Sequence, residues 1–211
     1  MKLYFKIVCY LFVVLAIGAA RAGSLEEFFH AIGLDDERTV GALLERGFDP
    51  NTVDAKGQVG LFLALREESD KVVKRLLAHP AIKLDAANAS LETPLMMAAL
   101  RGRMDWTRQL LDRGAAIERP GWNALHYAAS GPESKVVALL LDRGAAIDAL
   151  APNGTTALMM AARYGSDDSA RLLLARGAAA RLKNQAGLQA ADFARTAGRD
   201  NLAERLEQAV R

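Results

Sequence analysis

The chain is poor in the residue types that most redox and metal sites use. Its 211 residues include one cysteine and three histidines. The cysteine, Cys9, lies in a segment that we expect to be removed, and the remaining chain can then form neither a disulfide nor a thiolate metal site. No two histidines have the H-x-x-x-H spacing that places two metal ligands on one helix face. We therefore expect no metal and no cofactor.

The chain also lacks the short motifs of common enzyme classes. It contains no G-x-S-x-G nucleophile elbow and no G-x-x-x-x-G-K-[ST] phosphate loop. Its acidic clusters, Asp35–Glu37 and Asp167–Asp168, stand where we expect helices to begin, and carboxylates stabilise the positive end of a helix dipole. Because that role explains them, we assign no catalytic residue and predict that the chain is not an enzyme.

The apolar run near the N-terminus is too short to span a membrane. It covers residues 7–20, or 14 residues, whereas a spanning helix needs about 20. Lys2 and Lys6 precede it, and Ala20-Arg21-Ala22 offers small residues at both positions that precede a signal-peptide cut. We expect residues 1–22 to be a signal peptide cleaved after Ala22, and the protein to be bacterial and exported to the periplasm. Retention of the segment as an anchor is the alternative.

Neither sign of charge is in excess once this segment is set aside. The full chain has 27 basic and 25 acidic residues and a net charge of +2. Lys2, Lys6 and Arg21 leave with the signal peptide, so 24 basic residues face 25 acidic ones and the net charge becomes −1. A nucleic-acid-binding domain needs a concentrated basic surface, so we expect no nucleic acid partner.

What the chain does have is an internal repeat. The eight letters LLDRGAAI occur at residues 110–117 and again at 140–147, and looser copies occur at 43–51 and 173–181. Four glycines and one proline follow the leucine pairs at steps of 33, 34, 30 and 33 residues: Gly47, Pro80, Gly114, Gly144 and Gly177. A fixed period of this length indicates a stack of similar units, which presents an extended surface.

A second phrase recurs about a dozen residues before the leucine pairs. It reads TPLMMAA at residues 93–99, NALHYAA at 123–129 and TALMMAA at 156–162. The phrase resembles the T-P-L-H-x-A motif of ankyrin repeats, whose period is about 33 residues. The chain is similar to the ankyrin-repeat family past residue 24. The resemblance implies an all-α solenoid of about six helix-turn-helix units joined by hairpin-like loops.

Local chemistry predicts the same units. Thr93 can cap a helix with its hydroxyl, and Pro94 fits the first helical position because no N–H is needed there. A second helix that carries Val136 and Leu140 ends at Gly144, where a residue in the left-handed conformation is wanted. Such a helix pair cannot bury its apolar face alone, so neighbouring pairs must stack.

The repeat period also predicts the domain boundaries. After the signal peptide, residues 23–211 form one ankyrin-repeat domain. Its parts are an N-terminal capping pair at 24–53, repeats at 54–87, 88–118, 119–150 and 151–183, and a C-terminal capping pair at 184–211. Two segments depart from the pattern. Residues 59–65 lack the T-P-L-H-like phrase, so we expect the least ideal first helix there, and the loop at residues 118–122 is three residues shorter than its neighbours.

The resemblance implies where a partner binds, because ankyrin-repeat proteins usually use the hairpin tips and the exposed side of the first helices. Carried over by position, the tip residues are Lys56, Gln58, Glu92, Trp122 and Thr155. The residues at the ends of the first helices are Arg66, Leu100, Arg101, Ser130, Arg163 and Tyr164. Trp122 is the strongest candidate, because Trp anchors interfaces; the alternative is that the short loop folds back and buries its indole. His126 takes the histidine position of the motif, to which the resemblance assigns a structural hydrogen bond between repeats.

The resemblance implies a non-enzymatic binding module. We expect a monomer that scaffolds, protects or inhibits a periplasmic or envelope protein through its concave face. Two alternatives stay open. One is an immunity protein or a secreted effector, and the other is a ligand- or metal-binding protein or an unrecognised enzyme. The fold class does not name the partner.

Overall fold

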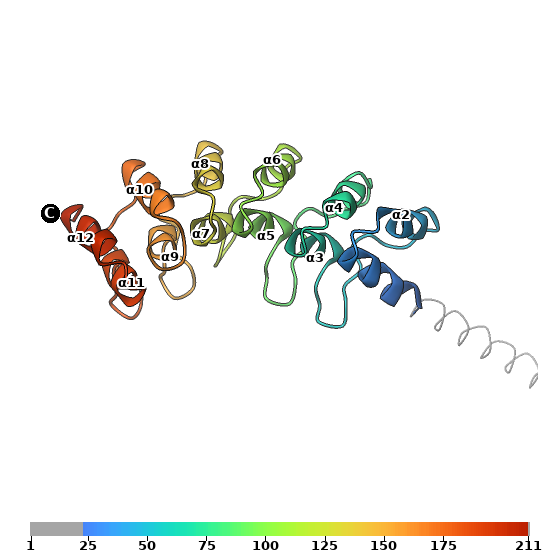
Figure 1. Cartoon of the computed structure of the whole chain (residues 1–211), viewed down its shortest axis with the longest axis horizontal. Coiled ribbons are helices and arrows are strands. Elements are labelled where there is room, and N and C mark those ends of the chain that lie inside the picture. The colour runs from blue at the N-terminus through green and yellow to red at the C-terminus, as the bar shows by residue number, and fades with distance from the viewer. Residues whose placement is uncertain (1–22, 211) are drawn as a thin grey trace, which may run out of the picture. The chain divides into compact units, whose positions relative to one another are not determined.

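The computed structural model describes residues 23–210. The predicted signal peptide, residues 1–22 with its cleavage site after Ala22, lies outside the described residues. Within them every regular element is a helix, and one isolated antiparallel bridge joins Val53 to Val59 (Figure 1). Contacts divide this part of the chain into two compact units, one ending at Lys83 and the other beginning at Leu84.

The first unit contains two helix pairs. The helix at residues 23–33 precedes α2 (Glu37–Glu45), and α3 (Gly60–Arg66) precedes α4 (Asp70–Leu77). The core of the unit consists of side chains that are at most 1% exposed, among them Phe28, Ile32, Leu43, Leu61, Phe62 and Leu76. The N-cap residue of α3, Val59, makes no side-chain capping bond, as expected where the repeat phrase is missing.

The second unit contains four helix pairs. They are α5 (Pro94–Leu100) with α6 (Met104–Asp112), α7 (Ala124–Ser130) with α8 (Ser134–Asp142), α9 (Ala157–Arg163) with α10 (Asp167–Ala175), and α11 (Ala190–Thr196) with α12 (Asp200–Gln208). In Figure 1, α6, α8 and α10 form one row and α5, α7 and α9 form another, so first helices pack on first helices. The six pairs in the described chain confirm the predicted all-α stack of helix-turn-helix units.

The single domain predicted for residues 23–211 stays a prediction, and within the described chain the contacts form the two units given above. In a repeat stack each pair contacts only its neighbours, so a stack contains no single core that every pair shares. The individual repeat boundaries stay predictions.

Three first helices of the second unit, α5, α7 and α9, begin with side-chain caps, and the one at Thr93 is the cap that the sequence predicts. The hydroxyl of Thr93 accepts a hydrogen bond from the backbone N–H of Met96 at 3.3 Å, and the hydroxyl of Thr156 accepts one from Met159 at 3.3 Å. Asn123 does the same for α7, with its Oδ1 3.2 Å from the backbone N of His126. Each cap satisfies an N–H that the helix leaves without a partner.

The second helices end at the predicted glycines. Gly47, Gly114, Gly144 and Gly177 have φ angles of +88° to +91°. In α8 the N–H of Gly144 donates to the Leu141 carbonyl at 3.0 Å, and the N–H of Ala145 donates to the Leu140 carbonyl at 3.0 Å. These bonds satisfy carbonyls at the end of the helix, and they need a left-handed residue between them.

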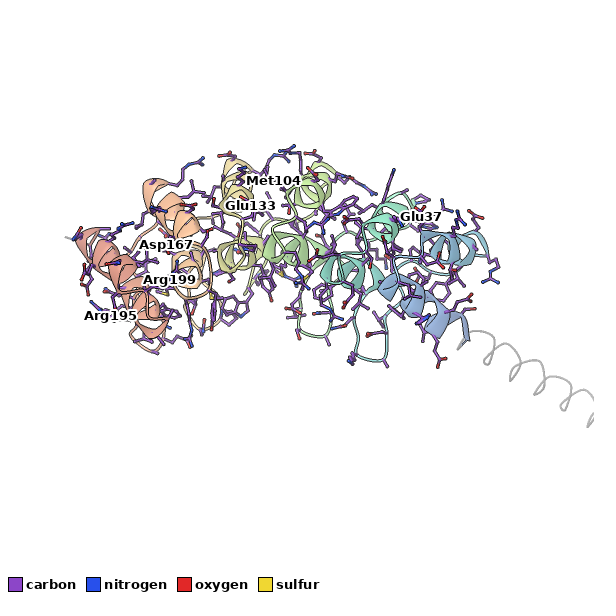
Figure 2. The ribbon with its side chains drawn as sticks, in the orientation of Figure 1. Glu37, Met104, Glu133, Asp167, Arg195 and Arg199 are labelled. Atoms are coloured by element: carbon purple, nitrogen blue, oxygen red, sulfur yellow. The ribbon has the colours of Figure 1, made fainter. Side chains whose placement is uncertain are left out.

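Carboxylates link successive loops of the second unit. Oδ1 of Asp85 accepts from the backbone N of Ala116 at 2.9 Å, and Oδ1 of Asp148 accepts from that of Ala179 at 2.9 Å. At the C-terminal pair an arginine makes the link. Arg199 donates to the carbonyls of Ala161 and Ala162 at the end of α9, and it pairs with Asp167 (Figure 2). These bonds hold each loop in place relative to the next.

Candidate functional site

An apolar pocket lies against the first helices of the second unit. Its volume is about 280 Å³. Helices α5, α7 and α9 and the loop before α7 supply its lining: Leu100, Trp122, His126, Tyr127, Ser130, Met160 and Tyr164. Four of these seven residues, Leu100, Trp122, Ser130 and Tyr164, are predicted partner contacts.

The repeat pattern explains why a space opens at this place. Ser130 occupies the position that Leu100 and Arg163 occupy in the neighbouring repeats. Its short side chain leaves room between two longer ones, and its hydroxyl donates to the His126 carbonyl on its own helix at 2.9 Å. The small residue in the middle repeat therefore provides the hollow that the larger neighbours surround.

Trp122 is half-buried, which corrects its prediction as an exposed tip residue. Its ring packs edge-on against that of His126, with centroids 5.3 Å apart and planes at 77°. The flanking loops close with backbone bonds from Asn88 to Glu92 at 3.0 Å and from Ala151 to Thr155 at 2.9 Å. The described residues 118–122 have no such bond, because this loop is three residues shorter than its neighbours. The short loop therefore lays the indole on the start of α7, as the alternative interpretation expected.

His126 forms the floor of the pocket and joins two repeats. It is fully buried, its Nε2 donates to the Thr155 carbonyl at 3.0 Å, and its Nδ1 accepts from the backbone N of Asn123 at 3.4 Å. Burial lowers the pKa of His126, against the opposing effect of the carbonyl acceptor. The predicted structural hydrogen bond between repeats is confirmed.

Thr155 is 1% exposed, so its prediction as a partner contact is wrong. Its carbonyl is the acceptor for His126, and its N–H donates to Oδ1 of Asn153 at 3.1 Å. The backbone bond between Ala151 and Thr155 closes the loop, so the tip of the loop lies between these two residues. Thr155 itself therefore lies at the base of the loop.

Glu92 is half-buried and bonded within its own unit. Its Oε1 accepts from the Tyr127 hydroxyl at 2.8 Å, and its Oε2 accepts from Asn88 Nδ2 at 2.7 Å. Burial, and then the neighbouring Glu92 carboxylate, raise the pKa of Tyr127 above its usual range. The hydroxyl therefore stays protonated. Glu92, predicted as a partner contact, positions Tyr127 in the pocket wall.

Exposed cationic and aromatic groups form the rim of the pocket at the end of α9. Tyr164 is 60% exposed. The guanidinium carbon of Arg163 lies 5.2 Å from the centre of the Tyr164 ring, a cation–π arrangement. Arg101, the neighbour of the lining residue Leu100, is also exposed. These three predicted contact residues are accessible to a partner.

The three remaining predicted contacts lie in the first unit, so they do not belong to this pocket. Lys56 is exposed at a loop tip. Gln58 Oε1 accepts from Arg66 Nη1 at 3.0 Å, and Arg66 also pairs with Glu67 at 2.8 Å. The side chains of Gln58 and Arg66 thus bind each other.

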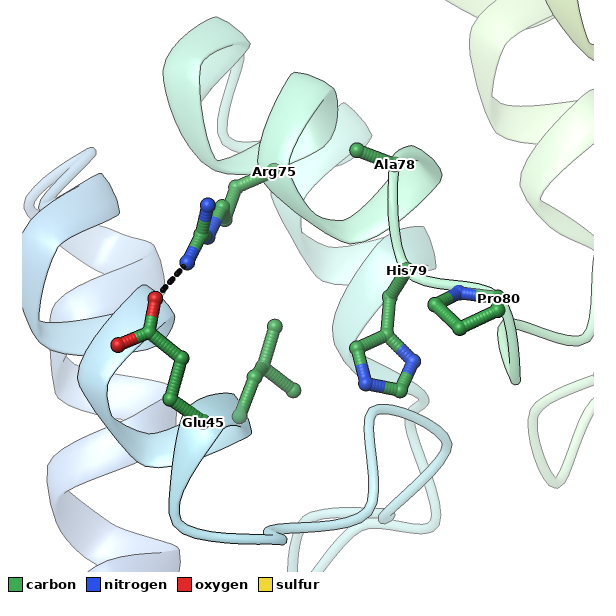
Figure 3. A pocket seen from close by; sticks show the side chains of 6 residues that line it. Glu45, Arg75, Ala78, His79 and Pro80 are labelled. Atoms are coloured by element: carbon green, nitrogen blue, oxygen red, sulfur yellow. Dashed lines mark hydrogen bonds and ion pairs between the residues drawn. The ribbon is translucent and has the colours of Figure 1, made fainter.

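A second cavity, of about 210 Å³, lies in the first unit (Figure 3). An ion pair between Arg75 of α4 and Glu45 of α2 borders it, together with His79 and Pro80. Nδ1 of His79 accepts from the backbone N of Ala81 at 3.2 Å. Arg75 and Glu45 already bind each other, and Nδ1 of His79 already has a backbone donor, so this cavity is a weaker candidate than the pocket of the second unit.

Besides His126, which was predicted to be structural, two lining residues, Tyr127 and Met160, are absent from the predicted contacts. Both occupy the fifth position of the repeated phrase, where Met97 is 5% exposed in α5. Their shared position in the phrase could have indicated them, because equivalent residues of successive first helices lie on the same face of the stack. Residue type alone gave no reason to choose them over Met97.

Between residues 23 and 210, no three His, Cys, Asp or Glu side chains come together in a way that could hold a metal ion. No helix in that range is long and apolar enough to cross a bilayer.

The sequence matches the family model described as "Ankyrin repeats (3 copies)" over residues 28–120 and again over residues 108–185. The chain belongs to the ankyrin-repeat family. It is 29% identical to mouse Rabankyrin-5 over 148 residues, covering 67% of this chain and 13% of that protein. It is 30% identical to the mouse B-cell lymphoma 3 protein homolog over 152 residues, covering 69% of this chain and 34% of that protein.

A third relative is mouse ankyrin repeat and SAM domain-containing protein 6, 31% identical over 112 residues, which are 51% of this chain and 13% of that protein. The chain thus spans about a third or less of the length of these relatives. The shared part is the repeat stack, and ankyrin repeats indicate a protein–protein interaction module. Ankyrin-repeat proteins are in general non-enzymatic scaffolds.

Proposed function

We propose that this protein is a non-enzymatic module that binds a partner protein at the pocket of the second unit. The observation that carries the proposal is the meeting of three aromatic side chains, Trp122, Tyr127 and Tyr164, around an apolar space of about 280 Å³. Trp and Tyr are enriched among the residues that dominate binding energy at protein interfaces. Such a pocket accepts an apolar anchor side chain from a partner.

A protein partner is favoured over a free small molecule. Pockets for drug-sized ligands usually have volumes of roughly 300–1,000 Å³ and enclose most of the ligand. This pocket, of about 280 Å³, falls just below that range and opens to solvent beside the 60% exposed Tyr164. Its size suits one side chain of a larger molecule, and family membership supports a protein as that molecule.

The proposed setting is the periplasm of a bacterium, where the module scaffolds, protects or inhibits a periplasmic or envelope protein. Support comes from Lys2, Lys6, the apolar run at residues 7–20 and the Ala20-Arg21-Ala22 site. The mass of the protein purified from its own host tests this setting. A mature N-terminus at Gly23 is expected, and an intact N-terminal segment in a cytoplasmic fraction would contradict the proposal.

The binding proposal is tested by cross-linked capture from the periplasmic fraction of the host. The tagged mature protein is compared with the double variant Trp122→Ala, Arg163→Ala and with the control Leu188→Ala. Leu188 is a 41% exposed leucine of the second unit that does not line the pocket. All three must show cooperative thermal unfolding.

A protein captured by the native chain and by the control, but lost with the double variant, supports binding at the pocket. Equal capture by all three proteins would show that partners bind elsewhere. A captured toxin would identify the protein as an immunity protein. That result would support the proposed binding site and would narrow the role of the protein to immunity.

A further inference from the structure

Two arginines beside the pocket have no carboxylate partner within residues 23–210. Arg163 is exposed, and its guanidinium lies over the ring of Tyr164. Arg119 is half-buried in the short loop and acts electrostatically on the Tyr127 hydroxyl. An arginine presents up to five N–H donors in a planar fork that matches a carboxylate. Both side chains are therefore able to bind an anionic group from outside.

The carboxylates around the same pocket, in contrast, are already bonded. Glu92 accepts from Tyr127 and Asn88, at 2.8 and 2.7 Å. Glu118 accepts from the backbone N of Ala146 at 2.8 Å and from Nδ2 of Asn123 at 3.1 Å. Both carboxylates keep their charge, but their oxygens are already bonded within the fold, whereas the guanidinium of Arg163 is exposed, so the charged group that the rim presents to a partner is a cation. A rim of this charge favours a partner segment that carries the opposite charge.

An exposed leucine lies in a strained conformation at the adjoining loop. Leu91 has a φ of +63° and is 65% exposed. Its N–H closes the turn to the Asn88 carbonyl at 2.9 Å, and glycines make the matching bond in three other loops: Gly57, Gly154 and Gly187. A left-handed conformation is costly for any residue that carries a Cβ.

The position of Leu91 connects this strain to the pocket. The next residue, Glu92, binds the hydroxyl of the lining residue Tyr127. The side chain of Leu91 is exposed and its backbone is strained, so glycine at this position would serve the fold with less strain. Residues held in costly backbone conformations cluster at binding sites, and exposed apolar residues beside a pocket mark contact surfaces.

We propose that the partner segment bound at this site carries an apolar side chain next to a carboxylate. The apolar side chain fills the pocket, the carboxylate pairs with Arg163, and a second apolar group contacts Leu91. This inference rests on the proposed function and adds the chemistry of the partner.

The test uses a display library of random peptides selected on the tagged mature protein. We expect the selected peptides to combine a large apolar residue with Asp or Glu close by. Arg163→Glu should weaken a selected peptide by about tenfold, which corresponds to about 1.4 kcal/mol. The same variant, used as bait, should select Lys or Arg in place of the acids. Arg181→Glu is the matched control, because Arg181 is exposed in the same unit and does not line the pocket.

Two further variants separate binding from folding. Ser130→Phe places a ring in the pocket and should abolish binding. Leu91→Gly should weaken binding of a selected peptide while it raises the melting temperature, so the loss of binding is not a loss of fold. Affinities are measured by fluorescence polarisation with the selected peptide, and folding is followed by thermal unfolding of each variant.

The outcomes distinguish the two proposals. Peptides that lose binding with Ser130→Phe but show no acidic preference, or that bind Arg163→Glu equally well, overturn the charge inference and leave the pocket as the site. Peptides that bind a folded Ser130→Phe variant as well as the native chain overturn both proposals. Failure of the native chain to select any peptide above background also overturns the inference.

Discussion

At the scale of single residues, one position of the repeated phrase does the same structural task with different side chains. His126 accepts from the backbone N of Asn123 at 3.4 Å, while Sδ of Met96 accepts from Thr93 and Sδ of Met159 from Thr156, each at 3.4 Å. The thioether is a weak acceptor and has no donor. Of these three side chains, only His126 has a second polar atom. That atom, Nε2, makes a hydrogen bond to the next repeat.

This difference predicts a pH dependence. The pKa of buried His126 lies below its usual 6.5, so the unfolded chain takes up a proton before the folded protein does. Its contribution to stability is complete above pH 6.5 and is lost as the pH falls from 6.5 through the lowered pKa. We expect the urea midpoint of the native protein to fall from pH 7 to pH 5, and that of His126→Gln to fall less. Parallel curves for the two proteins would contradict this assignment.

Leu91 gives a prediction in which glycine stabilises. Replacing Leu91 by Gly relieves the positive φ of +63° and removes a side chain that is 65% exposed. We expect the free energy of unfolding to rise by about 1 kcal/mol, because the strain exceeds the flexibility that glycine adds to the unfolded chain. Urea denaturation measures the change. Leu188→Gly is the control and should destabilise, because Leu188 does not have a positive φ; a loss of stability in Leu91→Gly would show that the strain is small.

At the scale of elements, each helix is short and depends on its ends. Helices α2 to α12 contain seven to nine residues each, a length at which an isolated helix is not stable in water. Because each helix is short, the caps at its ends matter more for its stability. The N-cap asparagine and threonines and the C-terminal glycines recur at the repeat period, which is why the element boundaries were predictable from sequence.

The glycine after α8 provides the test of this dependence. Gly144 has a φ of +91°, and a Cβ added there would meet no atom within 4 Å. Strain, rather than a clash, is therefore the cost of a side chain. We expect Gly144→Val to lower the free energy of unfolding by roughly 1 kcal/mol or more. Ala146→Val, at an exposed position without a positive φ, is the control; equal effects of the two substitutions in urea denaturation would refute the cap.

At the scale of the whole molecule, stability depends on bonds between neighbouring repeats. Asp85, Glu118 and Asp148 each accept a hydrogen bond from a backbone N–H of the next loop, at 2.8 to 2.9 Å. Each carboxylate lies about 30 residues from the atom that it binds, close to one repeat period. These bonds couple neighbouring repeats in addition to their apolar contacts and to bonds such as those of His126 and Tyr127.

Removal of one link should therefore weaken the stack. We expect Asp148→Ala to lower the free energy of unfolding by about 1 kcal/mol, since the Ala179 N–H loses a charged acceptor. Asp148→Asn keeps an acceptor oxygen and should lose less. Chemical denaturation, followed by circular dichroism, measures both. If the alanine variant were as stable as the native protein, solvent would be replacing the link at no cost.

The features that the sequence determined by itself are local ones. The caps at Thr93, Asn123 and Thr156 and the helix ends at Gly114, Gly144 and Gly177 depend on residues a few positions apart, and the repeat period is the spacing at which they recur. The role of His126 was also predictable, because the motif position implies the bond that it makes. The apolar pattern then leaves stacking of the pairs as the way to bury their faces.

Only the tertiary structure decided which of these residues a partner can reach. Thr155 and Glu92 look like tip residues in sequence, yet one is buried and the other holds Tyr127, because their bonding partners lie in the neighbouring repeat. Trp122 is drawn onto His126 by a loop that is too short to close. The pocket exists because a small residue in one repeat lies between larger ones from two others. That arrangement depends on side-chain volumes across the stack, which no single repeat contains.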